Sequence, residues 1–194
     1  MTSRFFAVIA LAVAAASSLS GCVSLAVGAV ASGAIAVAEE RTLGEQVDDL
    51  TIKLEISEAL FSYSERLFQD VSIDVTEGRV LLTGKVPSPD DRVDAVRIAW
   101  QAESVQEIIN ELQVTDTGGI ESYLTDVRIS NELRADLLFD SEINSINFNV
   151  ETVGGIVYLT GIAQDQAELE RVVDHARTIS GVKEVISHVR VKAA

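Results

Sequence analysis

The sequence predicts an α+β protein in which one small unit, two helices on one face of a three-stranded mixed sheet, occurs twice in tandem. Three observations support this prediction. Two parts of the chain match at a constant offset, apolar residues recur at helical spacing, and short alternating runs are bounded by glycine turns. A long segment without charged residues precedes both units.

The N-terminal segment has the order of a secretory signal peptide. Arg4 gives a positive start, residues 5–16 are apolar, and residues 17–21 are small and weakly polar. No charged residue occurs from 5 to 38, which exceeds the ~20 residues that span a bilayer. The alternative is therefore an uncleaved anchor with a buried, inert cysteine.

Cys22 is the single cysteine of the chain, so an internal disulfide or a multi-cysteine metal site is excluded. It closes the tetrapeptide LSGC, which resembles a bacterial lipobox. The resemblance implies cleavage before Cys22, a diacylglycerol thioether on its sulfur and an acyl chain on its amine. Val23, where an Asp would imply inner-membrane retention, implies the periplasmic face of the outer membrane. We predict a signal peptide over 1–21 and a lipidated cysteine with a small-residue tether over 22–48.

The remainder of the chain is a duplication with an offset of 77 residues. The string RVLLTG at 79–84 reappears as IVYLTG at 156–161, and the offset then holds without a gap. A long ungapped offset with matching glycines and core positions indicates duplication. The predicted ranges are 49–114 for the first domain, 115–125 for the linker and 126–194 for the second domain.

Each copy is predicted to form helix–strand–strand–helix–strand, and it opens with a helix whose apolar residues recur every four positions. These residues are Ile52, Ile56 and Leu60 in the first copy, and Ile129, Leu133 and Leu137 in the second. A hairpin follows, because alternating runs flank a turn at Glu77-Gly78 and again at Gly154-Gly155.

A second helix and a closing strand complete each copy. The helix of the first copy starts near Pro89, since proline is favoured at a helix start. Its apolar face is assigned to Val93, Val96 and Trp100, and that of the second copy to Leu169, Val172, Val173 and Ala176. The closing strands are predicted over 108–114 and 185–191. The outer face of each sheet must be polar or covered.

The lipobox, the small-residue tether, GEQVDD at 44–49 and two such units with LTG closing the second strand resemble the dual BON-domain outer-membrane lipoproteins, the OsmY/DolP-like family. The resemblance covers residues 19–194. It implies a non-enzymatic periplasmic protein that supports outer-membrane integrity and osmotic-stress tolerance, by binding phospholipid membrane. The alternative it implies is a protein-interaction or assembly module, because BON units resemble the ring-building domains of secretins.

The charge of the chain bears on both roles. The formal net charge is −15, which disfavours electrostatic nucleic-acid binding. Residues 49–114 carry 13 acidic and 6 basic side chains, net −7, and residues 126–191 carry 11 and 6, net −5. Lipid contact must therefore use a local patch against an unfavourable field, whereas a basic envelope protein would suit this surface as a partner.

The first helix of the second copy offers such a patch. Tyr123, Val127, Arg134 and Leu138 fall within about 60° of one another at 100° per residue, beside the core stripe. An amphipathic Tyr, two aliphatic residues and an Arg form an interfacial face. The alternative is a wide core stripe with an exposed Arg. The equivalent residues of the first copy lack a leading aromatic: Gln46, Leu50, Ser57 and Phe61.

Catalytic, metal and cofactor sites have no candidate residues. The two histidines, His175 and His188, have no cysteine partner and no HExxH spacing, and we expect His175 to be a solvated residue of the second helix. No GxSxG, P-loop or GxGxxG motif occurs. The sequence predicts a binding protein and not an enzyme.

Overall fold

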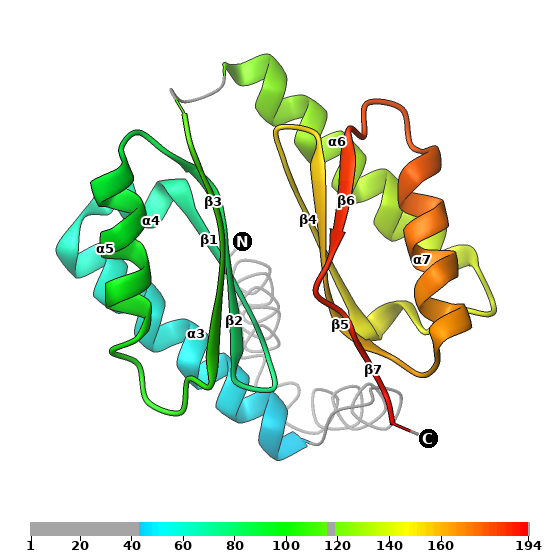
Figure 1. Ribbon diagram of the computed structural model, residues 1–194, viewed down its shortest axis with the longest axis horizontal. Helices are drawn as coiled ribbons and strands as arrows, with labels where there is room; N and C mark the ends of the chain where they lie inside the picture. The colour runs from blue at the N-terminus through cyan, green and yellow to red at the C-terminus, as the bar shows by residue number, and fades with distance from the viewer. Residues whose placement is uncertain (1–42, 116–118, 194) are drawn as a thin grey trace, which may run out of the picture. The chain divides into compact units, whose positions relative to one another are not determined.

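The structure, a computed structural model, describes residues 43–115 and 119–193. The predicted signal peptide, Cys22 and the tether up to residue 42 lie outside the described residues. Within the described ranges the chain forms two αββαβ units, called unit one and unit two below (Figure 1). No helix in these ranges is both long enough and apolar enough to cross a membrane.

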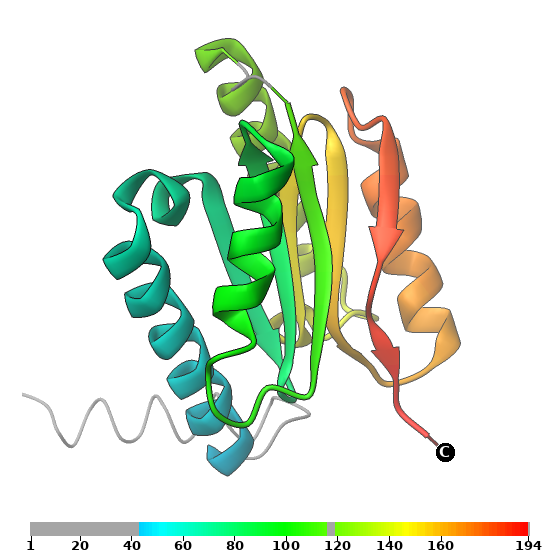
Figure 2. The ribbon, with the colours of Figure 1, turned by 60° about the vertical axis from the view of Figure 1, so that its left-hand side comes forward.

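Unit one is the predicted sandwich of two helices on a three-stranded sheet. The central strand β2 pairs antiparallel with β1 and parallel with β3, so the sheet is mixed. Figure 2 shows the long helices α3 and α5 on the same side of this sheet. The elements are α3 (Leu43–Tyr63), α4 (Glu65–Asp70), β1 (Val71–Thr76), β2 (Arg79–Val86), α5 (Pro89–Ala99) and β3 (Glu107–Val114).

Unit two repeats this order with two local differences. Its first helix starts at Ile120, so residues 120–125 of the expected linker are helical. Its closing strand is two short strands and not one, and both pair in parallel with β5. The elements are α6 (Ile120–Phe139), η2 (Ser145–Asn147), β4 (Phe148–Val153), β5 (Ile156–Ala163), α7 (Gln166–Thr178), β6 (Glu184–Ser187) and β7 (Arg190–Val191).

The prediction of a single strand over 185–191 was wrong at its centre, because β6 ends at Ser187 and β7 begins at Arg190. Between them the backbone N–H of Val189 donates to the Ser187 hydroxyl at 3.3 Å. The equivalent contact in unit one, from the Leu112 N–H to the Asn110 side chain at 3.1 Å, leaves β3 continuous, so this contact does not by itself explain the break.

The predicted core faces of the first helices are confirmed. The six residues that recur every four positions on α3 and α6 are each at most 2% exposed. Each unit has its own hydrophobic core, in which these residues pack against the inward residues of β1 and β2 or of β4 and β5. Alternation along the strands places Val80 and Leu82 in the first core, and Val157 and Leu159 in the second.

The predicted core face of α5 was right for Val96, which packs against the core, and wrong for Val93 and Trp100. Val93 is 65% exposed and Trp100, the C-cap residue, is 52% exposed, whereas Ala95, Ile98 and Ala99 are buried. The small alanine side chains allow α5 to lie close to the sheet. An assignment of the buried side from the largest apolar residues therefore fails for this helix. In α7 the assignment holds, because Val172 and Ala176 are fully buried and Leu169 and Val173 pack against the core.

A buried aspartate of the first helix closes each hairpin turn. Asp49 accepts hydrogen bonds from the backbone N–H groups of Glu77 at 2.9 Å and Gly78 at 2.8 Å. Asp126, at the equivalent position, accepts from Gly154 and Gly155, both at 2.8 Å. All four turn residues have positive φ, the requirement of a two-residue type I′ turn. Each aspartate thus ties a helix to a turn that is distant in sequence.

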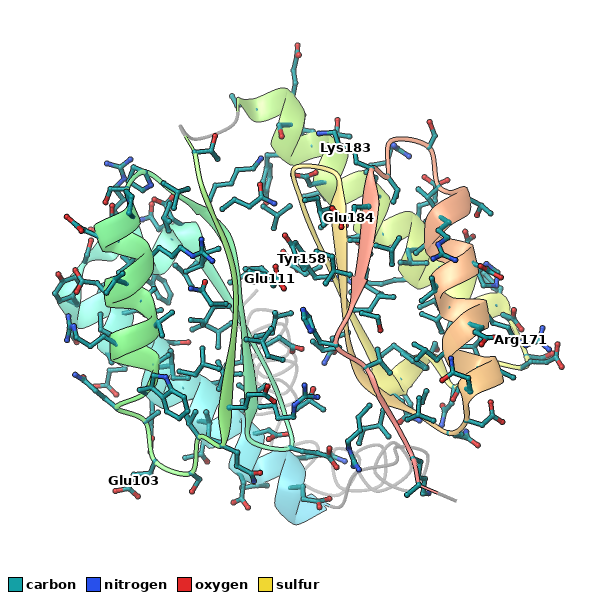
Figure 3. The ribbon with its side chains drawn as sticks, viewed as in Figure 1. Glu103, Glu111, Tyr158, Arg171, Lys183 and Glu184 are labelled. Carbon is teal, nitrogen blue, oxygen red and sulfur yellow. The ribbon has the colours of Figure 1, made fainter. Side chains whose placement is uncertain are left out.

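The outer faces of the two sheets are covered at their centre by each other. Leu81 of β2 and Tyr158 of β5 are 3% and 2% exposed and form a third buried cluster with Val153. Ile109, Ile156 and Ile186 pack against it. Burial raises the pKa of the Tyr158 hydroxyl, which accepts a hydrogen bond from the Gln113 amide at 3.3 Å. Figure 3 labels Tyr158 and, nearby, Glu111 of β3.

Candidate functional site

The candidate site is the solvent-facing side of α6. Ile129, Leu133 and Leu137 attach this helix to the core, and Asp126 attaches it to the β4–β5 turn, so its orientation is held at several points along its length. The opposite side carries large exposed apolar residues over five helical turns. Their exposed fractions are 78% for Ile120, 66% for Tyr123, 58% for Leu124, 38% for Val127 and 66% for Leu138.

The four residues predicted to contact lipid are all on this side, and the structure brings three of them to one groove. Tyr123, Val127 and Arg134 line a groove of about 450 Å³ between α6 and the ends of β1 and β2. We call it the α6 groove. Leu138 lines a neighbouring cavity of about 410 Å³, the central groove, which Arg134 shares. Arg134 therefore stands between the two grooves.

Arg134 is engaged with unit two and half exposed. Its guanidinium donates to the Val150 carbonyl oxygen and, at 3.4 Å, to the Asn131 amide oxygen. The Glu151 carboxylate lies 3.9 Å away. Burial raises the pKa of Glu151, while the charge of Arg134 acts to lower it. The cation is thus held in place but keeps about half of its side-chain surface open to solvent.

The second cation beside α6 comes from unit one. Lys85, near the end of β2, lines the α6 groove and donates to the Ser122 hydroxyl at 3.0 Å. Its ammonium is 3.8 Å from the Asp126 carboxylate. Sequence reasoning missed Lys85, because its position beside α6 depends on the contact between the two units, which leaves no local pattern in the sequence.

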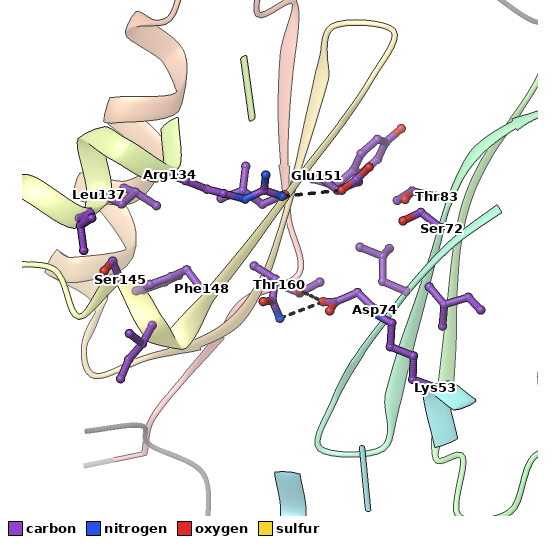
Figure 4. Close-up of a pocket in the computed structure, with 17 residues that line it drawn as sticks. Lys53, Ser72, Asp74, Thr83, Arg134, Leu137, Ser145, Phe148, Glu151 and Thr160 are labelled. Carbon is purple, nitrogen blue, oxygen red and sulfur yellow. Dashed lines mark hydrogen bonds and ion pairs between the residues drawn. The ribbon is translucent and has the colours of Figure 1, made fainter. Parts of the chain in front are cut away.

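The central groove carries both signs of charge, as Figure 4 shows. Lys53 of α3 and Arg134 line it together with two carboxylates, Asp74 and Glu151. Asp74 accepts hydrogen bonds from the Thr160 hydroxyl and from the Asn149 amide at 3.2 Å, so these bonds cross from unit one to unit two. Volumes of this size are typical of small-molecule sites.

The histidines lie away from both grooves. His175 is about one-third exposed and its Nε2 is 2.8 Å from Asp140, so the expectation of a freely solvated residue was too simple. This hydrogen bond is the main cause that lowers the pKa of Asp140. His188 bonds Glu111 at 2.9 Å. Among residues 43–115 and 119–193, no group of three or more His, Cys, Asp or Glu side chains could hold a metal ion.

Unit one presents an apolar side that the sequence analysis ranked below unit two. Large exposed residues follow α3 on the side away from its core: Val47 at 61%, Leu50 at 56%, Leu54 at 60% and Phe61 at 56%. Unit one has Gln46 where unit two has Tyr123, but it has the apolar Leu54 where unit two has the polar Asn131. The apolar side of α3 is therefore at least as continuous as that of α6.

The chain matches one protein family and several known proteins. The BON domain family model matches it twice, over residues 48–116 and 125–193. An uncharacterised protein encoded in the gshII 5′ region of Anaplasma centrale is 43% identical over 147 residues, covering 75% of this chain and 96% of that protein.

Two relatives with descriptive names are similar over most of their length. The osmotically-inducible protein Y of Escherichia coli is 30% identical, covering 77% of this chain and 76% of that protein. The outer membrane lipoprotein DolP of Haemophilus influenzae is 31% identical, covering 87% of each. Two family matches on two structurally equivalent units leave one assignment: the chain belongs to the BON-domain family and carries two BON domains in tandem.

Proposed function

We propose that this protein is a non-catalytic factor of the bacterial envelope, anchored by acyl chains on Cys22 to the periplasmic face of the outer membrane, which supports envelope integrity under osmotic stress by contacting phospholipid through α6. The observation that carries the proposal is the exposed apolar side of α6, with Arg134 at its edge. Membrane-facing helices combine these features.

The anchor is supported by sequence similarity and by the chemistry of the lipobox. The aligned stretch with DolP covers 170 residues, more than the 152 residues from 43 to 194, so the similarity extends into the N-terminal segment. Acyl chains contribute about 0.8 kcal/mol for each buried methylene, and a second or third chain makes attachment stable. A Cys22→Ala chain is expected to lose fatty-acid labelling and leave the membrane fraction. Labelling that persists in this variant contradicts the anchor.

The charges around α6 favour one class of lipid headgroup for the proposed contact. Arg134 and Lys85 can meet a phosphate, and Asp74 and Glu151 can meet an ammonium group. The acidic surface of both units opposes anionic headgroups. We therefore propose contact with zwitterionic phospholipid, whose headgroup carries both charges, in preference to anionic lipid.

Co-sedimentation with vesicles tests the contact separately from the anchor. The mature chain with Cys22→Ala is mixed with phosphatidylethanolamine-rich vesicles, with and without anionic lipid. We expect Tyr123→Ala, Arg134→Ala and Leu138→Ala each to reduce the bound fraction severalfold. Val93→Ala on α5 is the matched control, because Val93 is 65% exposed and Leu138 66%. Binding that is unchanged in the three α6 variants removes this surface from the proposal.

A periplasmic protein-interaction module is the second candidate function. The acidic surface favours it, because net charges of −7 and −5 in residues 49–114 and 126–191 suit a basic envelope partner. Pull-down from detergent-solubilised envelopes, with the acylated full chain as bait, distinguishes the two roles. A stoichiometric protein partner, together with no vesicle affinity of the unacylated chain, would favour this second role over lipid contact.

A further inference from the structure

The solvent-facing side of α3 has the spacing of a coiled-coil seam. Val47, Leu50, Leu54, Ser57 and Phe61 follow one another at intervals of three, four, three and four residues, which is the a–d repeat of a heptad. The seam is about 21 Å long at 1.5 Å per residue. Its four apolar members are 56–61% exposed, so nothing within the described part of the chain covers them.

The width of this side favours a helix over a bilayer as its partner. The four apolar residues fall within about 60° at 100° per residue, and a strict a–d stripe is the narrow seam of a helix pair. Helices that lie on membranes have a broader apolar face. The exposed apolar residues of α6 spread over about 100° at 100° per residue, whereas those of α3 form the narrower stripe.

We propose that the seam of α3 pairs with the α3 seam of a second copy of this chain, in parallel, on the membrane surface. The residue types fit, because Val47 at an a position followed by Leu50 at d favours a two-stranded pair. Ser57 is the single polar member, and its hydroxyl already donates to the Lys53 carbonyl at 2.7 Å. Its burial in the pair therefore leaves no donor unsatisfied.

The charges beside the seam are compatible with this pairing. Lys53 and Glu58 are the charged residues at the flanking g and e positions, five residues apart, which is the spacing of an interhelical ion pair between parallel helices. Asp48 and Glu55 occupy b positions, further from the partner. The corresponding side of α6 has Asn131 and Arg134 at its centre, so a pair of α6 helices would bury two arginines side by side.

The encounter of two copies rests on the proposed anchor. Leu43 begins α3, 21 residues after Cys22, so each α3 lies within about 75 Å of its own acyl chains. Two copies attached to the same leaflet can therefore reach each other, and the spacing of Lys53 and Glu58 favours the parallel sense. A seam this short buries less area than a stable solution dimer needs, and attachment to a surface supplies the missing effective concentration.

Disulfide trapping on vesicles tests the proposal. The acylated full chain carrying Leu54→Cys is reconstituted in phosphatidylethanolamine-rich vesicles and oxidised with copper phenanthroline. A parallel pair places the two copies of position 54 opposite each other, so we expect covalent dimer to form at least about tenfold faster than with Val93→Cys. Val93 is the matched control, since it is 65% exposed and Leu54 60%, but lies on α5, away from both the seam and the apolar side of α6.

A second variant ties the result to the seam. Leu50→Glu, added to Leu54→Cys, is expected to slow dimer formation to the rate of Val93→Cys. Equal rates for Leu54→Cys and Val93→Cys overturn the proposal. A water-soluble maleimide gives a second readout on vesicles. If it modifies Leu54→Cys slowly while no dimer forms, the proposal is also overturned, because the seam then faces the bilayer.

The intact mass of each sample separates this proposal from the anchor. If the mass shows no acyl chain on Cys22, the anchor fails, and the seam is tested on the unanchored chain with Cys22→Ser and Leu54→Cys at about 1 mM, the concentration a short tether supplies. An excess of dimer over the Val93→Cys control under those conditions keeps the α3 pair without the anchor. Its absence there rejects the pair.

Discussion

Glu111 and His188 occupy equivalent positions of the two repeats, 77 residues apart, and their side chains meet at 2.9 Å. Leu81 and Tyr158, and Ile109 and Ile186, are also equivalent pairs, and all four belong to the cluster between the sheets. The two BON domains are therefore related by an approximate twofold axis. Like the interface of a symmetric dimer, this contact uses the same surface of both partners.

One departure from this symmetry lies at the two hairpin turns. Arg190 of β7 forms an ion pair with Glu77 at the turn of unit one. At the equivalent place Gln113 donates to the Val153 carbonyl at 3.1 Å, beside Gly154 in the turn of unit two. One copy thus has an ion pair where the other copy has a hydrogen bond between neutral groups. The centre, which excludes water, stayed apolar.

The Glu111–His188 pair is expected to contribute modestly to stability. The two side chains are 26% and 21% exposed, so solvent screens them only in part. A double-mutant cycle with Glu111→Ala and His188→Ala should give a coupling energy of about 1 kcal/mol in urea unfolding. The same cycle on Asp174 and Arg177, 74% and 67% exposed, should give a value near zero. Equal couplings would show that the interface does not shield the Glu111–His188 hydrogen bond from solvent.

Removal of either buried turn aspartate should be severe. Asp126→Ala leaves the N–H groups of Gly154 and Gly155 without an acceptor, and we expect a loss of about 3 kcal/mol in unfolding free energy. Asp49→Ala should cost a similar amount in unit one. Asp48→Ala, the exposed neighbour of Asp49, is the control and should cost little. A loss below about 1 kcal/mol for Asp126→Ala would show that water replaces the carboxylate.

The glycine of each LTG motif is expected to be irreplaceable by alanine. Gly84 and Gly161 have φ of +132° and +124°, and an added Cβ would overlap the carbonyl oxygens of Asp70 and Asn147. Left-handed strain and overlap together should cost about 3 kcal/mol in each Ala variant. In Gly119→Ala the new methyl group meets nothing, and thermal unfolding should move little. A small shift for both LTG variants would contradict the close approach.

Glu151 should make the protein more stable in mild acid. Burial raises its pKa above the ordinary value of 4.5, so the folded state binds this proton more tightly than the unfolded state does. The contribution of this group is therefore fully present below the unfolded pKa, and it is lost as the pH rises through the folded pKa. Glu151→Gln should raise the melting temperature at pH 7 relative to the parent chain, and should do so less at pH 4.5. Destabilisation at pH 7 would mean that the contact with Arg134 outweighs burial.

The duplication, the order of the elements and the core sides of α3, α6 and α7 were all predictable from the sequence. These features depend on spacing along the chain: every fourth residue on a helix, every second on a strand, and a 77-residue offset between copies. The core side of α5 was predictable only at Val96, because its fully buried contacts are made by Ala95 and Ala99, which carry little hydrophobic signal, and by Ile98. Comparison with Val172 and Ala176 at the same offset would have corrected it.

The spacing of residues along the chain thus determined by itself the fold of each BON domain, a sandwich in which every helix and strand has one buried side. The tertiary structure alone decided what the two domains form together: Tyr158 buried against Leu81, Asp74 bonded to Thr160, and Lys85 beside α6. The physical reason is that these contacts join residues from opposite repeats. Their energy comes from excluding water between two sheet faces, and neither face carries in its own sequence a mark of which surface it will meet.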